Sequence, residues 1–176
     1  DLIKGQVISG EFGKILIRQK SGQELELGEL LIAESKGNII LMQVFDLIYG
    51  SQISQQNLEL ISGMKLEENT DMEFFDKNLR NYMLARLKNL ITISKNKASV
   101  SKLMPSFFSD VREIKKEDLS FLTKPNNPIY IGNLRSGSKM LDVPIFLEGS
   151  KVLTHHILIA GTTGRGKSTL ISNILW

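Results

Sequence analysis

Short apolar runs separated by turn residues occupy the first third of the chain and continue to about residue 64. The runs cover residues 6–8, 14–17, 30–33 and 38–45, and glycine occurs in the turns between them. Short strands at intervals of about ten residues are typical of small antiparallel barrels rather than of helices or open parallel sheets. The pattern therefore predicts a mainly β fold that begins with a small antiparallel β-barrel.

A helix appended to the barrel is predicted from four apolar residues that recur at every fourth position: Phe75, Leu79, Met83 and Leu87. Residues four apart share one face of a helix, and Thr70 or Asp71 can cap its start. We expect this helix to lie against the barrel. The β-branched end of residues 87–93 is equally compatible with a further strand that closes the barrel. We assign residues 1–95 to the barrel and its helix.

The second half of the chain begins with polar, proline-containing segments. We assign residues 96–128 to a linker with one short helical stretch near residues 116–122. Residues 129–176 are assigned to the start of an α/β P-loop domain. Three apolar runs predict strands there: residues 129–131, 143–147 and 156–160. The last run leads into a glycine-rich loop, and a helix is expected to begin near Gly166.

This loop has the spacing of a phosphate-binding P-loop, in which four residues separate a glycine from Gly-Lys-Ser. We expect nine residues to contact a nucleotide: Gly161, Thr162, Thr163, Gly164, Arg165, Gly166, Lys167, Ser168 and Thr169. A buried strand is predicted before the loop and a helix after it, which is the context that the pattern requires. The alternative is a glycine-rich turn without a function, but a lysine beside three glycines has little structural purpose.

Each position of the loop has a physical role. The three glycines let the backbone turn and approach phosphate oxygens, while N–H groups at the helix start point at the β-phosphate. Lys167 is expected to bridge the β- and γ-phosphates, Ser168 to ligate Mg²⁺, and Thr169 to lie near the α-phosphate. Hydrolysis also needs a later acidic residue and an arginine finger, neither of which we can place here. We therefore expect this segment alone not to hydrolyse ATP.

Composition excludes few classes of protein. The chain has 22 basic and 19 acidic residues, so its formal charge of +3 does not by itself indicate nucleic-acid binding. No apolar run reaches the roughly 20 residues needed to cross a bilayer, and the first residues given do not show a basic segment followed by an apolar one, as a signal segment would. The absence of cysteine excludes disulfides and thiolate metal sites. We expect a cytoplasmic protein without a membrane partner.

The whole chain resembles the HerA family of hexameric DNA-translocating ATPases and helicases, relatives of FtsK in the RecA-like P-loop group. Residues 3–8 (IKGQVI), 28–34 (GELLIAE) and 44–51 (VFDLIYGS) look like strands of the N-terminal HAS-barrel of that family. The stretch from IGNL at residues 131–134 to HILIAGTTG at residues 156–164 looks like the approach to its P-loop.

The resemblance implies that residues 161–169 bind ATP and Mg²⁺ and that the barrel serves ring assembly. It also implies a homo-hexamer around duplex DNA, a NurA-like nuclease partner, and a role in DNA end resection during double-strand-break repair. Arg165 departs from the family, which generally has a small residue there. Two alternatives stay open: a secretion or conjugation motor with the same loop, and a barrel module for oligomerisation and partner docking.

Three further groups of residues have both a functional and a structural interpretation. His155 and His156 suggest a metal site, but neighbouring residues on a strand point to opposite faces, which disfavours chelation of one ion. A basic group is a candidate surface for DNA or a solvated helix start: Arg112, Lys115 and Lys116. Four aromatic residues are candidates for partner docking or for ordinary packing: Phe45, Tyr49, Phe107 and Phe108.

Overall fold

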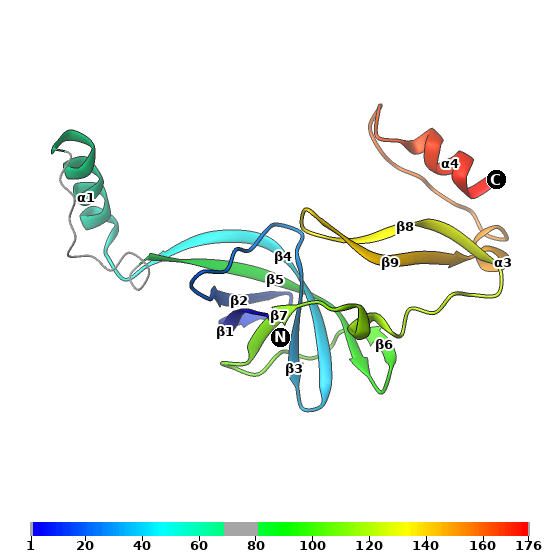
Figure 1. Ribbon diagram of the computed structural model, residues 1–176, viewed down its shortest axis with the longest axis horizontal. Coiled ribbons are helices and arrows are strands. Elements are labelled where there is room, and N and C mark those ends of the chain that lie inside the picture. Colours follow the sequence, from blue (N-terminus) through cyan, green and yellow to red (C-terminus); the bar gives the residue numbers. More distant parts are fainter. Residues whose placement is uncertain (1, 69–80, 176) are drawn as a thin grey trace. The chain divides into compact units, whose positions relative to one another are not determined.

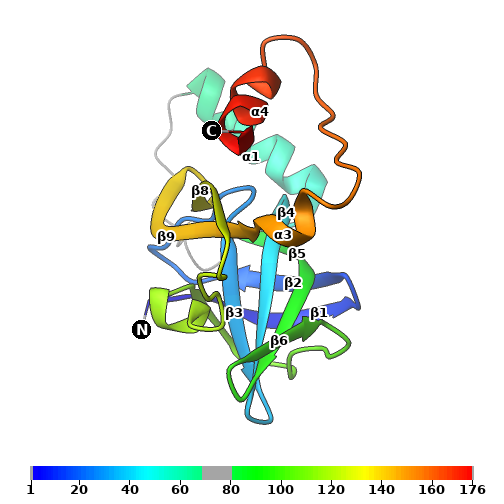
Figure 2. The same ribbon diagram turned by 90° about the vertical axis from the view of Figure 1, so that its right-hand side faces the viewer.

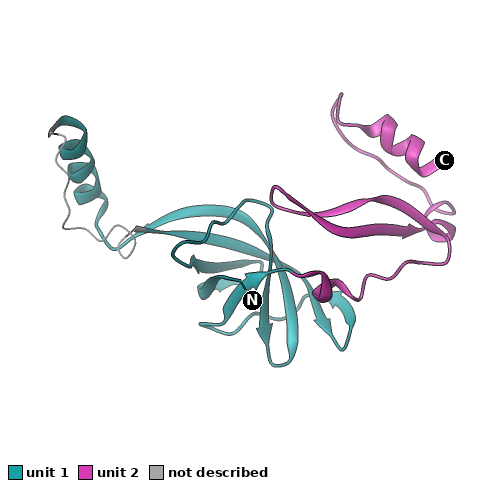
Figure 3. Cartoon of the chain, viewed as in Figure 1, with its two compact units in different colours: residues 1–114 teal, residues 115–176 magenta. Residues whose placement is uncertain are grey.

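The fold was analysed in a computed structural model, which describes residues 2–68 and 81–175. The chain is mainly β and divides into two compact units, Asp1–Ile114 and Lys115–Trp176 (Figure 3). Residues 96–114, which the sequence placed in a linker, belong to the first unit and contain two of its strands. Among the described residues, no helix is long and apolar enough to cross a membrane.

The first unit is a closed antiparallel β-barrel of six strands (Figures 1 and 2). Its strands, in chain order, are β1 (Ile3–Glu11), β2 (Lys14–Gln19), β3 (Leu30–Ser35), β4 (Asn38–Ser51), β5 (Asn81–Ser94) and β7 (Asp110–Glu113). Around the barrel the order is β2-β1-β7-β3-β4-β5, and pairing of β2 with β5 closes the ring. The four predicted strands in residues 6–45 are confirmed, and so is the barrel.

Alternating apolar side chains fill the interior of the barrel. Ile15 pairs with Leu87 and Ile17 with Ala85 across the closing ladder, and all four side chains are fully buried. Because successive strand residues face opposite sides, this register directs one face of each strand inward. The same core includes side chains from every other barrel strand: Val7, Leu31, Ala33, Ile40, Met42, Val44 and Val111.

The helical prediction for residues 70–87 is wrong where the structure describes it. Met83 and Leu87 lie in β5, while Thr70, Asp71, Phe75 and Leu79 lie outside the described residues. Ala85, Leu87 and Asn89 are buried in alternation, which is the period of a strand. The alternative prediction of a barrel-closing strand at residues 87–93 is confirmed.

The helix before β5 was missed by the sequence analysis. α1 spans Gln55–Glu68 and follows β4. Its apolar residues are spread around the helix axis rather than gathered on one side, and Leu60 and Leu66 are exposed. A helix without an apolar stripe lacks the periodic signal that sequence analysis detects.

One further short strand extends the barrel sheet. β6 (Lys97–Val100) forms a hairpin with the end of β5. Residues 101–109 then return to β1, where the N–H of Phe108 donates to the carbonyl of Val7 at 2.9 Å. The polar and proline-containing composition of this return segment explains why the sequence predicted a linker there.

The second unit contains a β-hairpin and three short helices. A 3₁₀-helix, η1 (Lys116–Leu119), comes first, within the region where a short helical stretch was predicted. The hairpin consists of β8 (Pro128–Ser136) and β9 (Lys139–Glu148), which pair in antiparallel fashion. α3 (Gly149–Val152) and α4 (Lys167–Leu175) follow. Strands were expected at residues 129–131 and 143–147, and both are present in longer form.

Candidate functional site

The glycine-rich loop lies directly before α4 in the second unit. The N–H of Leu170 donates to the carbonyl of Gly166 at 2.9 Å, which is the first hydrogen bond of the helix. The N–H groups of Lys167, Ser168 and Thr169 precede that bond and have no acceptor within the helix. Free N–H groups and the positive end of the helix dipole make such a helix start suitable for a phosphate group.

Two glycines give the loop its shape. Gly164 has φ 78° and Gly166 has φ 76°, in the left-handed region that glycine enters without a steric cost. Neither position has an atom within 4 Å of where a Cβ would lie. The glycines are therefore required for backbone conformation in this structure, and the space beside them is open.

Lys167 folds back over the loop. Its Nζ donates hydrogen bonds to the carbonyl of Gly161 at 2.6 Å and to the carbonyl of Thr162 at 2.8 Å. A Cβ at Gly161 would lie 3.4 Å from Cγ of Lys167, so the lysine stem runs close to the backbone here. The structure thus brings the first glycine of the loop and the lysine of the helix into contact, although six positions separate them.

The charge of the site also suits an anion. Residues 153–176 contain no aspartate or glutamate, while Arg165 and Lys167 supply positive charge. Arg165, Ser168 and Thr169 are exposed. Glycine N–H groups, a lysine and a serine hydroxyl are donors and ligands that fit a Mg²⁺-bound phosphate.

The strand predicted at residues 156–160 is absent, and this prediction was wrong. The segment has no strand partner among the described residues, and Leu158 is 90% exposed. A strand needs a neighbour to receive its backbone hydrogen bonds, and an apolar sequence alone does not provide one. The helix predicted near Gly166 is confirmed by α4.

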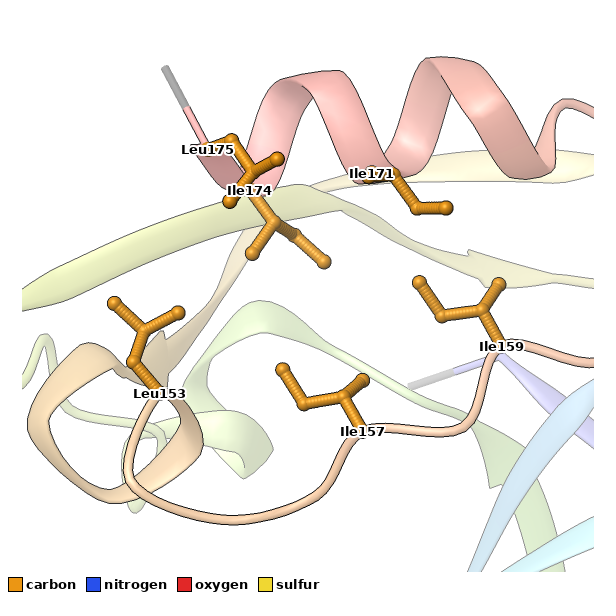
Figure 4. A pocket seen from close by; sticks show the side chains of 6 residues that line it. All are labelled: Leu153, Ile157, Ile159, Ile171, Ile174 and Leu175. Carbon is orange, nitrogen blue, oxygen red and sulfur yellow. The ribbon is translucent and has the colours of Figure 1, made fainter.

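An apolar hollow lies between this segment and α4 (Figure 4). Its volume is about 300 Å³, and its lining is entirely aliphatic: Leu153, Ile157, Ile159, Ile171, Ile174 and Leu175. Ile157 and Ile159 project to the same side because residues two apart share a face of an extended chain. The hollow has no donor or charged side chain, so it does not itself suit a phosphate.

The two histidines follow α3, and hydrogen-bond contacts hold the first of them there. Nδ1 of His155 lies 2.6 Å from the carbonyl of Lys151 and 3.2 Å from the hydroxyl of Thr154, which ties the ring to the end of α3. In the part of the chain that the structure describes, no group of three potential ligands comes together. The second-unit site thus consists of backbone N–H groups, Lys167 and hydroxyls.

The predicted basic group is not a set of free charges. Arg112 lies in β7 and pairs with Glu34 at 3.3 Å, whereas Lys116 lies in the second unit and pairs with Asp142 at 3.0 Å. Lys115 is the residue before η1 and takes part in a capping arrangement with Asp118. Lys115 and Lys116 therefore form the start of a short helix, which is the structural one of the two interpretations.

The four candidate aromatic residues are all exposed. Phe45 is 45% exposed, Tyr49 88%, Phe107 61% and Phe108 63%, so none of them packs in the barrel core. Leu103 and Met104 are exposed beside the last two but were not singled out from the sequence. The sequence contains a sign of Leu103 and Met104, since this apolar pair precedes Pro105 inside an otherwise polar segment.

Comparison with models of known protein families gives a match in the second unit. Residues 129–176 match the family described as Helicase HerA, central domain. The match covers the β8–β9 hairpin, the phosphate loop and α4, and it agrees with the resemblance seen in the sequence. It supports a HerA-like relationship for the second unit. No curated protein sequence matches the chain.

Proposed function

We propose that the chain binds ATP through residues 161–169, as the barrel and P-loop portion of a HerA-like ATP-dependent motor. The observation that carries the proposal is the contact of Lys167 with Gly161 and Thr162 at the N-terminus of α4. This contact closes the loop around the unpaired N–H groups of the helix start. The match of residues 129–176 to the HerA central domain supports the same assignment.

Each residue of the loop has a distinct task in this proposal. Gly164 and Gly166 hold the backbone N–H groups toward the phosphates. The ammonium group of Lys167 donates to loop carbonyl oxygens in this structure and donates to phosphate oxygens instead when the nucleotide is bound. The hydroxyl of Ser168 serves as one ligand of Mg²⁺, which neutralises charge on the β- and γ-phosphates when bound. Thr169 lies one residue further along the helix start and contacts the α-phosphate.

The test is a fluorescence titration of the chain with Mg²⁺ and an ATP analogue that carries a fluorescent ribose group. Lys167→Ala should weaken binding at least about tenfold, because hydrogen bonds to charged groups contribute about 1.5–3 kcal/mol. Lys151→Ala is the matched control, since this lysine is exposed in the same unit and pairs only with Glu148. Equal binding by the wild-type chain and Lys167→Ala would contradict the proposal.

We further propose that the motor acts on DNA. The barrel followed by a HerA-like segment supports a DNA translocase or helicase that assembles as a hexameric ring around duplex DNA. On the resemblance to HerA, this motor acts with a NurA-like nuclease in DNA end resection and double-strand-break repair. The alternative is a motor of secretion or conjugation, which would move a different cargo.

Oligomeric state distinguishes a ring-forming motor from a barrel that only docks partners. Light scattering after size exclusion, with and without Mg²⁺-ATP and a 40-base-pair duplex, would measure it. A ring-sized species that binds the duplex supports the translocase. A monomer that binds neither nucleotide nor duplex would contradict the motor hypothesis and favour a barrel module that docks partner proteins.

A further inference from the structure

Arg165 is a cation of the phosphate loop that the fold itself does not use. Its side chain is exposed. Among the described residues, its guanidinium group forms neither an ion pair nor a hydrogen bond. By contrast, Lys167 is half-buried, and its ammonium group donates to two carbonyls of the loop. Lys167 therefore contributes to the shape of the loop, whereas Arg165 is available to a ligand.

The backbone places Arg165 between two left-handed glycines. The φ angle is 78° at Gly164 and 76° at Gly166, whereas Arg165 is not among the residues with positive φ. In a turn of this kind, successive backbone N–H groups converge on a concavity that suits an anion. Neither glycine has an atom within 4 Å of where a Cβ would lie. The loop therefore leaves room for a ligand on both sides of Arg165.

Arg165 and Lys167 begin beside the same backbone position. A Cβ placed on Gly161 would lie 4.0 Å from Cβ of Arg165 and 3.4 Å from Cγ of Lys167. Both side chains are long and have several rotatable bonds, so their charged ends can meet at one ligand without a change in the backbone. The geometry thus brings two cations to one side of the loop.

No carboxylate near these cations in the sequence neutralises them. Residues 153–176 contain no aspartate or glutamate. Earlier in the second unit, Asp142 pairs with Lys116 at 3.0 Å, and Glu148 pairs with Lys151 at 2.8 Å. Two like charges that lie close together repel each other, and a bound anion removes this repulsion. The pair of cations therefore favours a ligand group that concentrates negative charge at one point.

The terminal phosphate is the most highly charged group of a nucleotide. A phosphate with one ester link carries about 1.5–2 negative charges at pH 7, whereas a phosphate linked on both sides has a single acidic oxygen. A planar guanidinium group can donate parallel hydrogen bonds to two oxygens of the same phosphate. Because Lys167 is assigned to the β- and γ-phosphates, the second cation beside Gly161 is suited to the γ-phosphate.

We propose that Arg165 binds the γ-phosphate and makes the loop selective for nucleoside triphosphates over diphosphates. This inference rests on the proposed function, because it requires a nucleotide in the loop. A diphosphate keeps the contacts of its β-phosphate with the N–H groups of the helix start and with Lys167. It has no phosphate for Arg165. The affinity for a triphosphate therefore depends on Arg165, and the affinity for a diphosphate does not.

The test compares the affinities of the intact chain for two nucleotides. ADP and a non-hydrolysable ATP analogue, both with a fluorescent ribose group, would be titrated in the presence of Mg²⁺. Arg165→Ser should weaken binding of the ATP analogue about tenfold, because it removes hydrogen bonds to a charged group. Its affinity for ADP should equal that of the wild-type chain. The ratio of the two dissociation constants is the quantity that reports on Arg165.

Two further variants control for charge and geometry. Arg135→Ser removes an exposed arginine from β8 of the same unit and should keep the wild-type ratio. Arg165→Lys keeps the charge but loses the parallel donors, so its ratio should lie between those of the wild-type chain and Arg165→Ser. Because Arg165 is exposed and unpaired in the described structure, Arg165→Ser should not lower the midpoint of thermal unfolding.

The outcomes separate this inference from the proposed function. If Arg165→Ser binds both nucleotides with the wild-type ratio, the role of Arg165 is overturned and the proposed function stands. Equal weakening of both nucleotides would also overturn that role, since it indicates a distorted loop rather than a lost γ-phosphate contact. The same change of ratio in Arg135→Ser would assign the effect to the overall charge of the unit. A wild-type chain that binds neither nucleotide would overturn both proposals.

Discussion

Nζ of Lys167 lies 2.6 Å from the carbonyl oxygen of Gly161, so the helix start and the first glycine of the loop are joined by a charged hydrogen bond. Removing the lysine would leave the loop carbonyls without this donor and the phosphate site without its main positive charge. The same ammonium group thus shapes the loop in this structure and recognises phosphate in the proposed function.

Ser168→Ala should remove the Mg²⁺-dependent part of nucleotide binding. The hydroxyl is the proposed protein ligand of the ion, and alanine cannot replace it. Titrations with and without Mg²⁺ would show a smaller ratio of dissociation constants for the variant than for the wild-type chain. Ser172→Ala, on the same helix but beyond the loop, should keep the wild-type ratio. An unchanged ratio in Ser168→Ala would show that Ser168 does not bind the ion.

Gly166→Ala should weaken nucleotide binding by about tenfold. A left-handed conformation costs a residue with a Cβ about 1–2 kcal/mol, and Gly166 has φ 76°. The space beside Gly166 is open, so strain rather than a clash is the cause. The measurement is the same fluorescence titration, accompanied by circular dichroism to confirm that the fold is retained. Wild-type affinity in this variant would mean that the loop changes its backbone conformation on binding.

Sequence analysis succeeded where residue patterns are local. The strands β1 to β4 contain short apolar runs separated by turns with glycine, and the phosphate loop has fixed spacing. It was wrong at Met83 and Leu87, because a spacing of four satisfies a helix while the alternation of Ala85, Leu87 and Asn89 satisfies a strand. Only pairing with β2 and β4 decides between them.

Other features depend on partners distant in the chain. Residues 157–160 have the composition of a buried strand, but no described strand pairs with them. The exposure of Phe108 follows from hydrogen bonds to Val7 and between Ser106 and Ser109, which no spacing reveals. For the same reason, sequence analysis could name Phe107 and Phe108 only as candidates for docking or packing, and the structure was needed to show that both are exposed.

Asn89→Ala should lower the free energy of unfolding by about 1–3 kcal/mol, because two backbone groups lose their side-chain partner. Asn89 is 9% exposed and joins the β1–β2 turn at Gly13 to the loop at Leu103. Urea unfolding followed by circular dichroism measures the change. Asn57→Ala, at an exposed position of α1, should change stability little. Equal effects of the two variants would show that the bridge through Asn89 does not hold the loop.

The pair formed by Glu148 and Lys151 should be visible in a titration. A hydrogen bond from Lys151, at 2.8 Å, lowers the pKa of Glu148, and the same contact raises the pKa of Lys151. Because the folded carboxyl has the lower pKa, the pair stabilises the fold above the unfolded pKa. This contribution disappears as the pH falls through the folded pKa. The groups are exposed, so the effect on stability is small.

Carbon-detected NMR of Glu148 provides the measurement for this pair. Lys151→Ala should return the pKa of Glu148 toward its ordinary value, whereas Lys139→Ala should leave it unchanged. A carboxyl that titrates identically in the wild-type chain and Lys151→Ala would contradict the assignment of Lys151 as the main cause.

The most direct test of the phosphate site is an amide chemical-shift map of the chain with Mg²⁺ and a non-hydrolysable ATP analogue. The account predicts that the largest shifts fall on the amides of residues 161–169 and that those of the barrel core, such as Ile15 and Leu87, stay unchanged. Absence of shifts in the loop at saturating analogue, or shifts confined to the barrel, would contradict the proposal that this loop binds nucleotide.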